Sequence, residues 1–499
     1  MTRIAARIAT VVALVGVLVA AGFYPTHLSP REDKFSPEET TGTEHGVTPY
    51  LPFDLPTGPT PRKVFAHYVP NFPISIDNED GDRDYYQRHY LSPDGEGGIH
   101  ADYGGLLRDR PLPRRHLDQS DWRIADFATE IAQARSVGID GFAIDVIQRR
   151  AQSDVVDNIL LAAARDVDFD ILITADMSGP LSQVGTDEFV ADFATYLAAP
   201  AAIRLADGRP VLSAFAAERR APQWWAAVLD ALTARLHTKI AFVPVFVDVS
   251  DNIARYAPIS YGLSAWGGRS PHAMALSERR SGSPGDLIDQ AHRRGKVWMQ
   301  SVPFQDNRPR SGTFEESLNG MTNRMAWQLA VEKKAEWVQL ITWNDYAEST
   351  AMAPSVAHGW RMLDLNAYDL ARFKWETPPT VTRDAIFVSY RIQPVEARPA
   401  YHESLLMRPV PGTAEPRDAI EVVSFARARS EIAIVAGDQV TACSAPVGRG
   451  TCLAPLSLGV FTVTMTRGGV VVASARSDVP VVDRPVVQDL QYRLVGGLR

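Results

Sequence analysis

The stretch Trp337-Val-Gln-Leu-Ile-Thr-Trp-Asn-Asp-Tyr-Ala-Glu-Ser349 joins an apolar run to an abrupt polar ending. A parallel strand that is covered on both faces has a nearly continuous apolar sequence instead of an alternating one. Residues 337–343 fit that description, and two carboxylates three residues apart, Asp345 and Glu348, follow directly. The stretch therefore predicts a buried parallel strand that delivers two acids to the loop at its carboxyl end.

Seven earlier runs have the same character, at residues 64–68, 141–146, 170–176, 210–215, 240–247, 262–266 and 297–302. Helical patterns separate most of them, at 122–137, 154–166, 187–199, 223–236, 284–294 and 314–334, whereas the fifth connection, near 251–257, is short. This alternation is typical of βαβ units, and eight strands close a barrel. An open doubly wound sheet would need a Gly-rich phosphate loop after the first strand, which is absent. We predict a (β/α)8 TIM barrel over residues 62–380.

The N-terminus has the features of an export signal. Arg3 and Arg7 precede the apolar run 8–23, but no clean Ala-x-Ala cleavage site follows. We interpret residues 1–23 as either a cleaved signal peptide or an N-terminal membrane anchor. Residues 24–61 are rich in Pro, Thr, Glu and Asp and have no apolar period, which indicates a disordered linker. The protein is therefore expected outside the cell, secreted or held at the membrane by this segment.

The chain changes character after Pro378-Pro379. Short β-rich segments at 386–390, 420–426, 432–436, 459–466 and 470–473 are separated by Gly, Pro and polar turns. This pattern predicts an all-β, sandwich-like domain over residues 381–499. Cys443 and Cys452 are the two cysteines of the chain. In an exported protein such a nearby pair is more often a structural disulfide than a catalytic or metal-binding pair, so we predict a disulfide.

The charge of the chain excludes some partners. The 499 residues have a formal net charge of -8, and no stretch supplies the clustered Lys and Arg that phosphate binding needs. No His, Cys, Asp or Glu cluster has metal-ligand spacing. We therefore expect no nucleic-acid partner, no metal and no cofactor. A monomer that acts on a neutral polysaccharide fits these properties.

Active sites of (β/α)8 barrels lie at the carboxyl ends of the strands. Hydrolysis of a glycosidic bond needs one carboxylic acid to protonate the leaving oxygen and one carboxylate to act as base or nucleophile. We predict Asp345 and Glu348 as this pair, because two close acids in a partly apolar site titrate apart. The expected substrate-binding residues lie at or near the same strand ends: His67, Tyr68, Asp145, Asp176, Trp266, Trp343, Asn344 and Tyr346. The alternatives are that the two acids only cap the loop and pair with Arg361 or Arg372, and that His67 is a hydrogen-bonded core residue.

Residues 342–349 resemble the Trp-Asn-Asp-Tyr-Gly-Glu-Ser motif of glycoside hydrolase family 71, the α-1,3-glucanases or mutanases. Six further segments resemble the matching strands of that family in the same order: 63–68, 138–145, 174–178, 208–213, 241–246 and 262–266. The resemblance covers residues from about 62 to about 395. It implies endo-hydrolysis of α-1,3-glucan, an α-glucan, with inversion. In this scheme Asp345 would be the base that activates water and Glu348 the acid.

The chain departs from the family pattern at several positions. Ala347 replaces the motif Gly, Asp145 stands where Asn is expected, residues 350–353 lack the usual aromatic, and the loop 305–313 is polar and Arg-rich. The acid pair is kept, so the hydrolase class is better supported than the particular glucan. Two alternatives remain open. One is an endo-α-mannosidase like those of family 99, whose eighth strand also carries two acids three apart, and the other is a cell-surface polysaccharide-binding barrel without turnover.

Overall fold

The computed structural model describes residues 49–499 except 167, 250, 270, 272–273 and 276–281. These residues fall within one compact unit. The predicted signal or anchor, 1–23, and most of the predicted linker, 24–48, lie outside the described residues. Among the helices of the described part, none combines the length and the apolar character that crossing a membrane requires.

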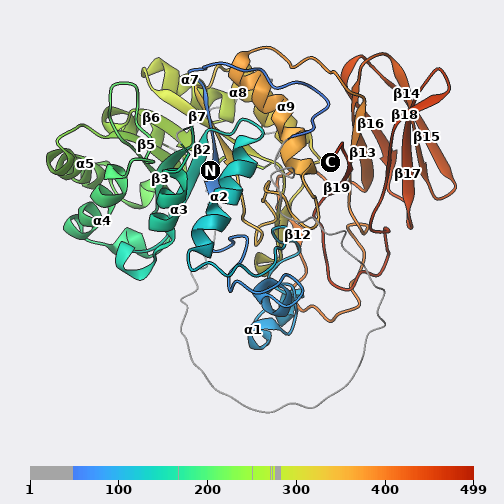
Figure 1. Cartoon of the computed structure of the whole chain (residues 1–499), viewed down its shortest axis with the longest axis horizontal. Helices are drawn as coiled ribbons and strands as arrows, with labels where there is room; N and C mark the ends of the chain where they lie inside the picture. Colours follow the sequence, from blue (N-terminus) through green and yellow to red (C-terminus); the bar gives the residue numbers. More distant parts are fainter. Residues whose placement is uncertain (1–48, 167, 250, 270, 272–273, 276–281) are drawn as a thin grey trace, which may run out of the picture. The chain divides into compact units, whose positions relative to one another are not determined.

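Eight parallel strands close into a barrel in the order β1-β10-β7-β6-β5-β4-β3-β2 (Figure 1). They are β1 (Lys63–Tyr68), β2 (Gly141–Val146), β3 (Asp170–Asp176), β4 (Val211–Phe215), β5 (Ala241–Phe246), β6 (Gly262–Ala265), β7 (Val297–Pro303) and β10 (Trp337–Ile341). Each begins and ends within two residues of its predicted position. The (β/α)8 prediction is therefore confirmed.

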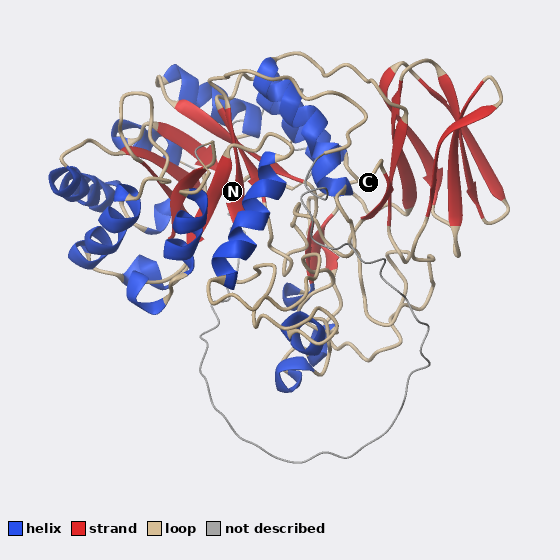
Figure 2. Ribbon diagram, viewed as in Figure 1, coloured by secondary structure: helices blue, strands red, loops and turns tan. Residues whose placement is uncertain are grey.

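Helices cover the outside of the barrel (Figure 2). They are α2 (Trp122–Arg135), α3 (Val155–Ala163), α4 (Thr186–Ala198), α5 (Pro222–Leu236), α6 (Asn252–Tyr256), α7 (Pro284–Arg293), α8 (Met321–Glu332) and α9 (Arg361–Trp375). Shorter turns are η2 (Tyr86–Tyr90), α1 (Gly95–Gly98), η3 (Ala101–Tyr103), η4 (Arg150–Gln152), η5 (Pro180–Gln183), η6 (Ala217–Arg219), η7 (Ala257–Ile259) and η8 (Pro309–Ser311). The fifth connection, α6, is short as predicted.

Two features of the barrel were not predicted. Helix α9 is buried on nearly all sides, including Asp364, Asn366 and Asp369, so its sequence lacks the single apolar stripe that marks a surface helix. The helix predicted over 314–334 begins only at Met321, because β8 (Asp306–Arg308) and β9 (Thr313–Glu315) form a hairpin before it. The hairpin is completed by β12 (Arg408–Pro409), which lies far along the sequence and pairs with β9.

Two four-stranded antiparallel sheets follow, ordered β16-β13-β11-β19 and β15-β14-β17-β18. Their strands are β11 (Ala385–Tyr390), β13 (Ala419–Ala426), β14 (Ser430–Ala436), β15 (Gln439–Ala445), β16 (Gly448–Pro455), β17 (Phe461–Arg467), β18 (Val470–Arg476) and β19 (Arg493–Gly496). Apolar side chains from both sheets share one buried core, which confirms the all-β prediction. Strands β15, β16 and β19 were missed because the first two contain only three β-branched residues, Val440, Thr441 and Thr451, and β19 is four residues long.

The predicted disulfide is present. Cys443 on β15 is bonded to Cys452 on β16, nine positions away, so the bond joins an edge strand of one sheet to an edge strand of the other. Residues 49–61, at the end of the predicted linker, also pack against the fold. Phe53 is 2% exposed and contacts the rings of Tyr368 and Phe425. The packed chain therefore starts before residue 62.

Replacing both cysteines with serine should lower the free energy of unfolding by about 2–3 kcal/mol, because the bond closes a short loop and ties the two sheets together. Equilibrium urea unfolding followed by circular dichroism measures the change under non-reducing conditions. Reductant should lower the stability of the wild type and leave the double variant unaffected. An unchanged midpoint in the variant would contradict the structural role of the bond.

Candidate active site

Four predicted residues meet at the carboxyl ends of the barrel strands: His67 on β1, Asp145 on β2, Asp176 on β3 and Trp266, directly after β6. His67 Nε2 lies 3.8 Å from Asp145 Oδ1, and the His67 and Trp266 rings are 4.8 Å apart between centroids. Burial raises the pKa of Asp176 to about 6, and the negative charge of Asp145 adds to this rise. The structure therefore brings these four side chains into one cluster, the strand-end cluster.

Two buried acceptors at the strand-end cluster have no hydrogen-bond partner within the described part of the chain. One is Asp145 Oδ1, and the other is Oε1 of the neighbouring Gln339. The amide of Gln339 on β10 donates to His67 Nδ1 over 2.8 Å, which orients the imidazole. His67 is thus a hydrogen-bonded, buried histidine, as one alternative held, and it also borders unpaired polar atoms. A buried acceptor without a donor is costly unless another molecule supplies the hydrogen bond.

The two acids of the opening motif lie in the loop after β10. Asp345 Oδ1 accepts the backbone N–H groups of Ala347, at 3.0 Å, and Glu348, at 3.2 Å, so its carboxylate is held in one orientation. The left-handed residue of this loop is Ser349, with φ of 53°, and not Ala347. Alanine therefore fits the position of the motif glycine without backbone strain.

The partner of Glu348 is an arginine that the sequence analysis did not name. Arg308 Nη2 on the β8–β9 hairpin lies 2.8 Å from Glu348 Oε2, and the backbone N–H of Asn307 donates to the Glu348 carbonyl over 2.8 Å. Arg361, a partner only under the alternative in which the two acids cap the loop, donates instead to the Gly496 carbonyl. The signal in the sequence was the polar, Arg-rich composition of the loop 305–313.

Two further charged side chains, Asp306 and Arg269, lie beside the contact between Arg308 and Glu348. Asp306 accepts two hydrogen bonds from Arg308, at 2.6 and 2.7 Å, and one from Arg269 Nε at 3.0 Å. Asp306 and Arg269 are almost fully buried. Arg269 also donates to the Trp266 carbonyl, which connects the acid loop with the strand-end cluster.

The two acids have different pKa values. Burial raises the pKa of Glu348 to about 8, the negative charge of Asp345 adds to the rise, and Arg308 opposes it. Burial raises the pKa of Asp345 to about 6, against the positive charge of Arg308. The larger rise at Glu348 favours Glu348 as the acid of the pair that holds a proton. The Glu348 side chain remains 28% exposed, so a molecule in the barrel mouth can reach it.

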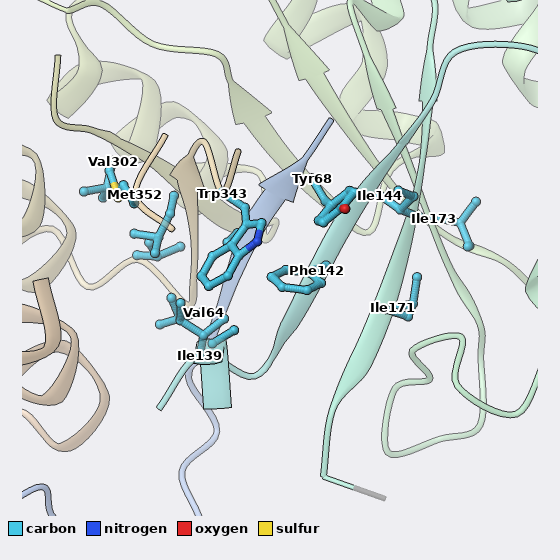
Figure 3. Close-up of a cluster of buried hydrophobic side chains, with 14 of the residues drawn as sticks. Val64, Tyr68, Ile139, Phe142, Ile144, Ile171, Ile173, Val302, Trp343 and Met352 are labelled. Carbon is cyan, nitrogen blue, oxygen red and sulfur yellow. The ribbon is translucent and has the colours of Figure 1, made fainter. Parts of the chain in front are cut away.

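Tyr68 and Trp343, expected to bind substrate, lie instead in the packing between the barrel and α2. Figure 3 shows both beside Phe142 in the apolar cluster, and both are 0% exposed. Tyr68 OH and Trp343 Nε1 donate to the two oxygens of Glu130, at 2.9 and 3.0 Å. Successive side chains of a strand point to opposite faces, so Tyr68 points outward because His67 points inward.

Asn344 and Tyr346 also differ from their expected role, because both are at most 1% exposed. The Asn344 side chain accepts from the Val69 backbone N–H and donates to the carbonyls of Val69 and Phe72, which ties the loop after β10 to the loop after β1. Tyr346 packs against Phe72 and Tyr86. Both side chains shape the loop and do not line its surface. Within the described ranges, no group of three His, Cys, Asp or Glu side chains is arranged to hold a metal ion.

A family model described as Glycosyl hydrolase family 71 matches residues 117–491. The chain belongs to glycosyl hydrolase family 71. This confirms the resemblance seen in the sequence and makes the protein a glycoside hydrolase. A mutanase from Penicillium rubens is 21% identical to this family 71 protein over 387 residues, 73% of this chain and 83% of the mutanase.

Solved structures with a similar fold include the GH99 endo-α-mannosidase from Bacteroides thetaiotaomicron. It has a TM-score of 0.47 and 13% identity, and the match covers 62% of the family 71 chain and 97% of the other. Its complex with bis-tris propane has a TM-score of 0.46 and 15% identity, with 62% and 96% covered.

Glu130 should make stability depend on pH. Burial raises its pKa to about 8 from 4.5, despite the hydrogen bonds from Tyr68 and Trp343. The folded state therefore keeps a proton that the unfolded state loses between these values, so the stability contributed by Glu130 is complete below pH 4.5 and is lost as the pH rises through 8. Because Glu130→Gln cannot ionise, its unfolding free energy relative to wild type should rise by up to about 1.4 kcal/mol per pH unit in this window.

Melting temperatures of wild type and Glu130→Gln, measured from pH 5 to 8, test this expectation. Tyr68→Phe is the matched control, because it removes a neighbouring hydrogen bond but keeps the carboxyl group and its pH dependence. Parallel melting curves for wild type and Glu130→Gln across this range would show that Glu130 is ionised in the folded protein.

Proposed function

We propose that this family 71 hydrolase is a secreted endo-α-1,3-glucanase that inverts the configuration at the anomeric carbon. The observation that carries the proposal is the pair of acids in the loop after β10, in which backbone N–H groups hold Asp345 and Arg308 contacts Glu348, and in which burial and the charge of Asp345 raise the pKa of Glu348. Glycosidic hydrolysis needs this division between acid and base. The likeness to a mutanase supports the choice of glucan, and the Arg3 and Arg7 segment supports export.

In the proposed reaction Glu348 gives its proton to the glycosidic oxygen as the bond from that oxygen to the anomeric carbon breaks. A water molecule attacks the same carbon from the opposite face and loses a proton to Asp345. Asp345 Oδ1 is occupied by two backbone N–H groups, so Oδ2 is the oxygen that takes this proton. The products are two shorter chains, and the new hydroxyl has inverted configuration.

The strand-end cluster would hold the sugar next to the broken bond. Sugars are bound by polar side chains that pair with their hydroxyls and by aromatic rings that cover their C–H faces. Asp145 Oδ1 and Gln339 Oε1 are acceptors ready for sugar hydroxyls, and Trp266 supplies a ring beside them. Asp176 and His67 would complete the polar side of this pocket.

Asp345→Asn and Glu348→Gln should each lower kcat on α-1,3-glucan by about 100- to 10,000-fold, because each removes one proton-transfer group. Reducing-sugar release measures the loss, and the melting temperature should stay within a few degrees of wild type. Asp230→Asn, which changes an exposed acid on the outer helix α5, is the control and should keep full activity. Wild-type activity in either acid variant would refute the assignment.

The first product released from α-1,3-glucan should be the β-anomer, because an inverting enzyme reverses the configuration of an α-linkage. NMR of fresh product, with α-1,4-glucan and α-mannan as parallel substrates, measures both stereochemistry and specificity. An α-anomer would identify a retaining enzyme, and cleavage of α-mannan alone would favour the mannosidase alternative. Binding without hydrolysis of any of these polymers would favour a binding barrel.

A further inference from the structure

We infer that Arg308 is a positioning residue for Glu348, and that Asp306 and Arg269 hold its guanidinium group in place. The inference rests on the proposed role of Glu348 as the acid. Its basis is the linear arrangement Arg269–Asp306–Arg308–Glu348, in which each neighbouring pair is joined by a contact of 2.6–3.0 Å. None of these three residues was expected to matter from the sequence motif of the acid pair.

The contact with Arg308 distinguishes the two oxygens of Glu348. Arg308 donates to Oε2, and a neutral carboxylic acid accepts hydrogen bonds more strongly at its carbonyl oxygen than at its hydroxyl oxygen. The proton of Glu348 is therefore placed on Oε1. A carboxylic acid acts efficiently only when the oxygen that bears the proton is within hydrogen-bond reach of the atom that receives it.

The charge of Arg308 also acts after the proton has left. Glu348 then becomes an anion, and the guanidinium group next to it stabilises that anion. An arginine without a negative neighbour would also stabilise the Glu348 anion before the reaction, and it would lower the pKa of Glu348 so far that the proton is lost too early. The guanidinium group of Arg308 also donates to Asp306, and the negative charge of Asp306 offsets that effect.

The charged groups around Glu348 come from four elements. Asp345 is in the same loop, Arg308 and Asp306 come from β8, and Arg269 follows β6. Glu315 on β9 lies behind them, close to Asp306 and Arg269. Two positive and three negative side chains thus lie in or next to this contact, and the removal of one of them should shift the pKa of Glu348 in the direction that its charge predicts.

The hairpin that carries Arg308 is held by the chain that follows the barrel. Strand β12 pairs with β9 through the Arg408 N–H to the Gly312 carbonyl, at 3.0 Å, and the Val410 N–H to the Phe314 carbonyl, at 2.9 Å. Phe314 is buried against Met407 and Leu490. The post-barrel chain therefore fixes the position of the hairpin.

A second set of bonds holds the chain on either side of the hairpin. Tyr492 donates its backbone N–H to Gln305 Oε1 and its hydroxyl to Glu316 Oε1, both over 2.7 Å. Arg391 donates to Glu316 Oε2 over 2.8 Å, and this pair is almost fully buried. The residues just before and just after the hairpin are thus both anchored to the β-sheet region, so Arg308 has little freedom to move away from Glu348.

The test is the pH profile of kcat/KM for four variants on the polysaccharide that the wild type cleaves. The alkaline limb of the wild type reports the ionisation of Glu348. Arg308→Gln should move this limb up by about one pH unit and lower kcat at least tenfold with little change in KM, whereas Asp306→Asn should move it down by about one unit. Arg308→Lys should recover part of the lost kcat. Arg310→Gln, an exposed arginine of the same hairpin, should match the wild type.

Opposite shifts in Arg308→Gln and Asp306→Asn would establish the inference, and wild-type limbs in both folded variants would overturn it. If Asp306→Asn does not fold, Arg308→Gln decides alone, because an upward shift in folded protein does not arise from lost stability. Glu348→Gln separates this result from the proposed function. Full activity in Glu348→Gln would mean that the assignment of Glu348 as the acid fails. If Glu348→Gln is inactive but the alkaline limbs of Arg308→Gln and Asp306→Asn stay at the wild-type pH, only the positioning role of Arg308 is refuted.

Discussion

The closure of the barrel between its first and last strands is the constraint on which the candidate active site depends. Strands β1 and β10 are far apart in the sequence, yet Lys63 to Ala66 pair in register with Trp337 to Leu340. The contact continues past the strands. There the backbone N–H of Trp343 donates to the His67 carbonyl over 2.7 Å, and the Asn344 side chain accepts from the Val69 backbone N–H in the loop after β1. Because of this closure, the loop that carries the two acids starts directly beside His67 and the strand-end cluster.

The strands of the barrel could be predicted because each is covered on both faces and has an uninterrupted apolar sequence. The acids could be predicted because they follow one such strand. Tyr68, Trp343, Asn344 and Tyr346 were predicted to bind substrate but are buried, since position at a strand end does not tell which face a side chain takes. Because successive side chains of a strand point to opposite faces, an inward His67 places Tyr68 on the outside of the barrel. Asn344 lies in the loop after the strand, where this alternation no longer applies.

Arg308, Asp306 and Arg269 were beyond the reach of local sequence analysis for a different reason. The hairpin that carries two of them is stabilised by β12 and by Tyr492, and neither partner is visible in the sequence of residues 305–315. A polar, Arg-rich segment looks like an exposed loop when its partners are unknown, although Asp306 is 1% exposed. In this protein the departure from the family pattern at that loop places Arg308, which is held by the buried Asp306, in a partly exposed contact with Glu348.

Because β9 pairs with β12, the barrel and the β-sheet region that follows it are not structurally independent domains. One strand of the hairpin sheet comes from the segment after the barrel, so a cut made between residues 380 and 381 would leave the barrel with every strand intact but with an unpaired strand edge and an unsupported arginine beside its acid. A shortened protein or a chimera that exchanges the β-sheet region would have to carry residues 391, 407–410 and 490–492 with the barrel.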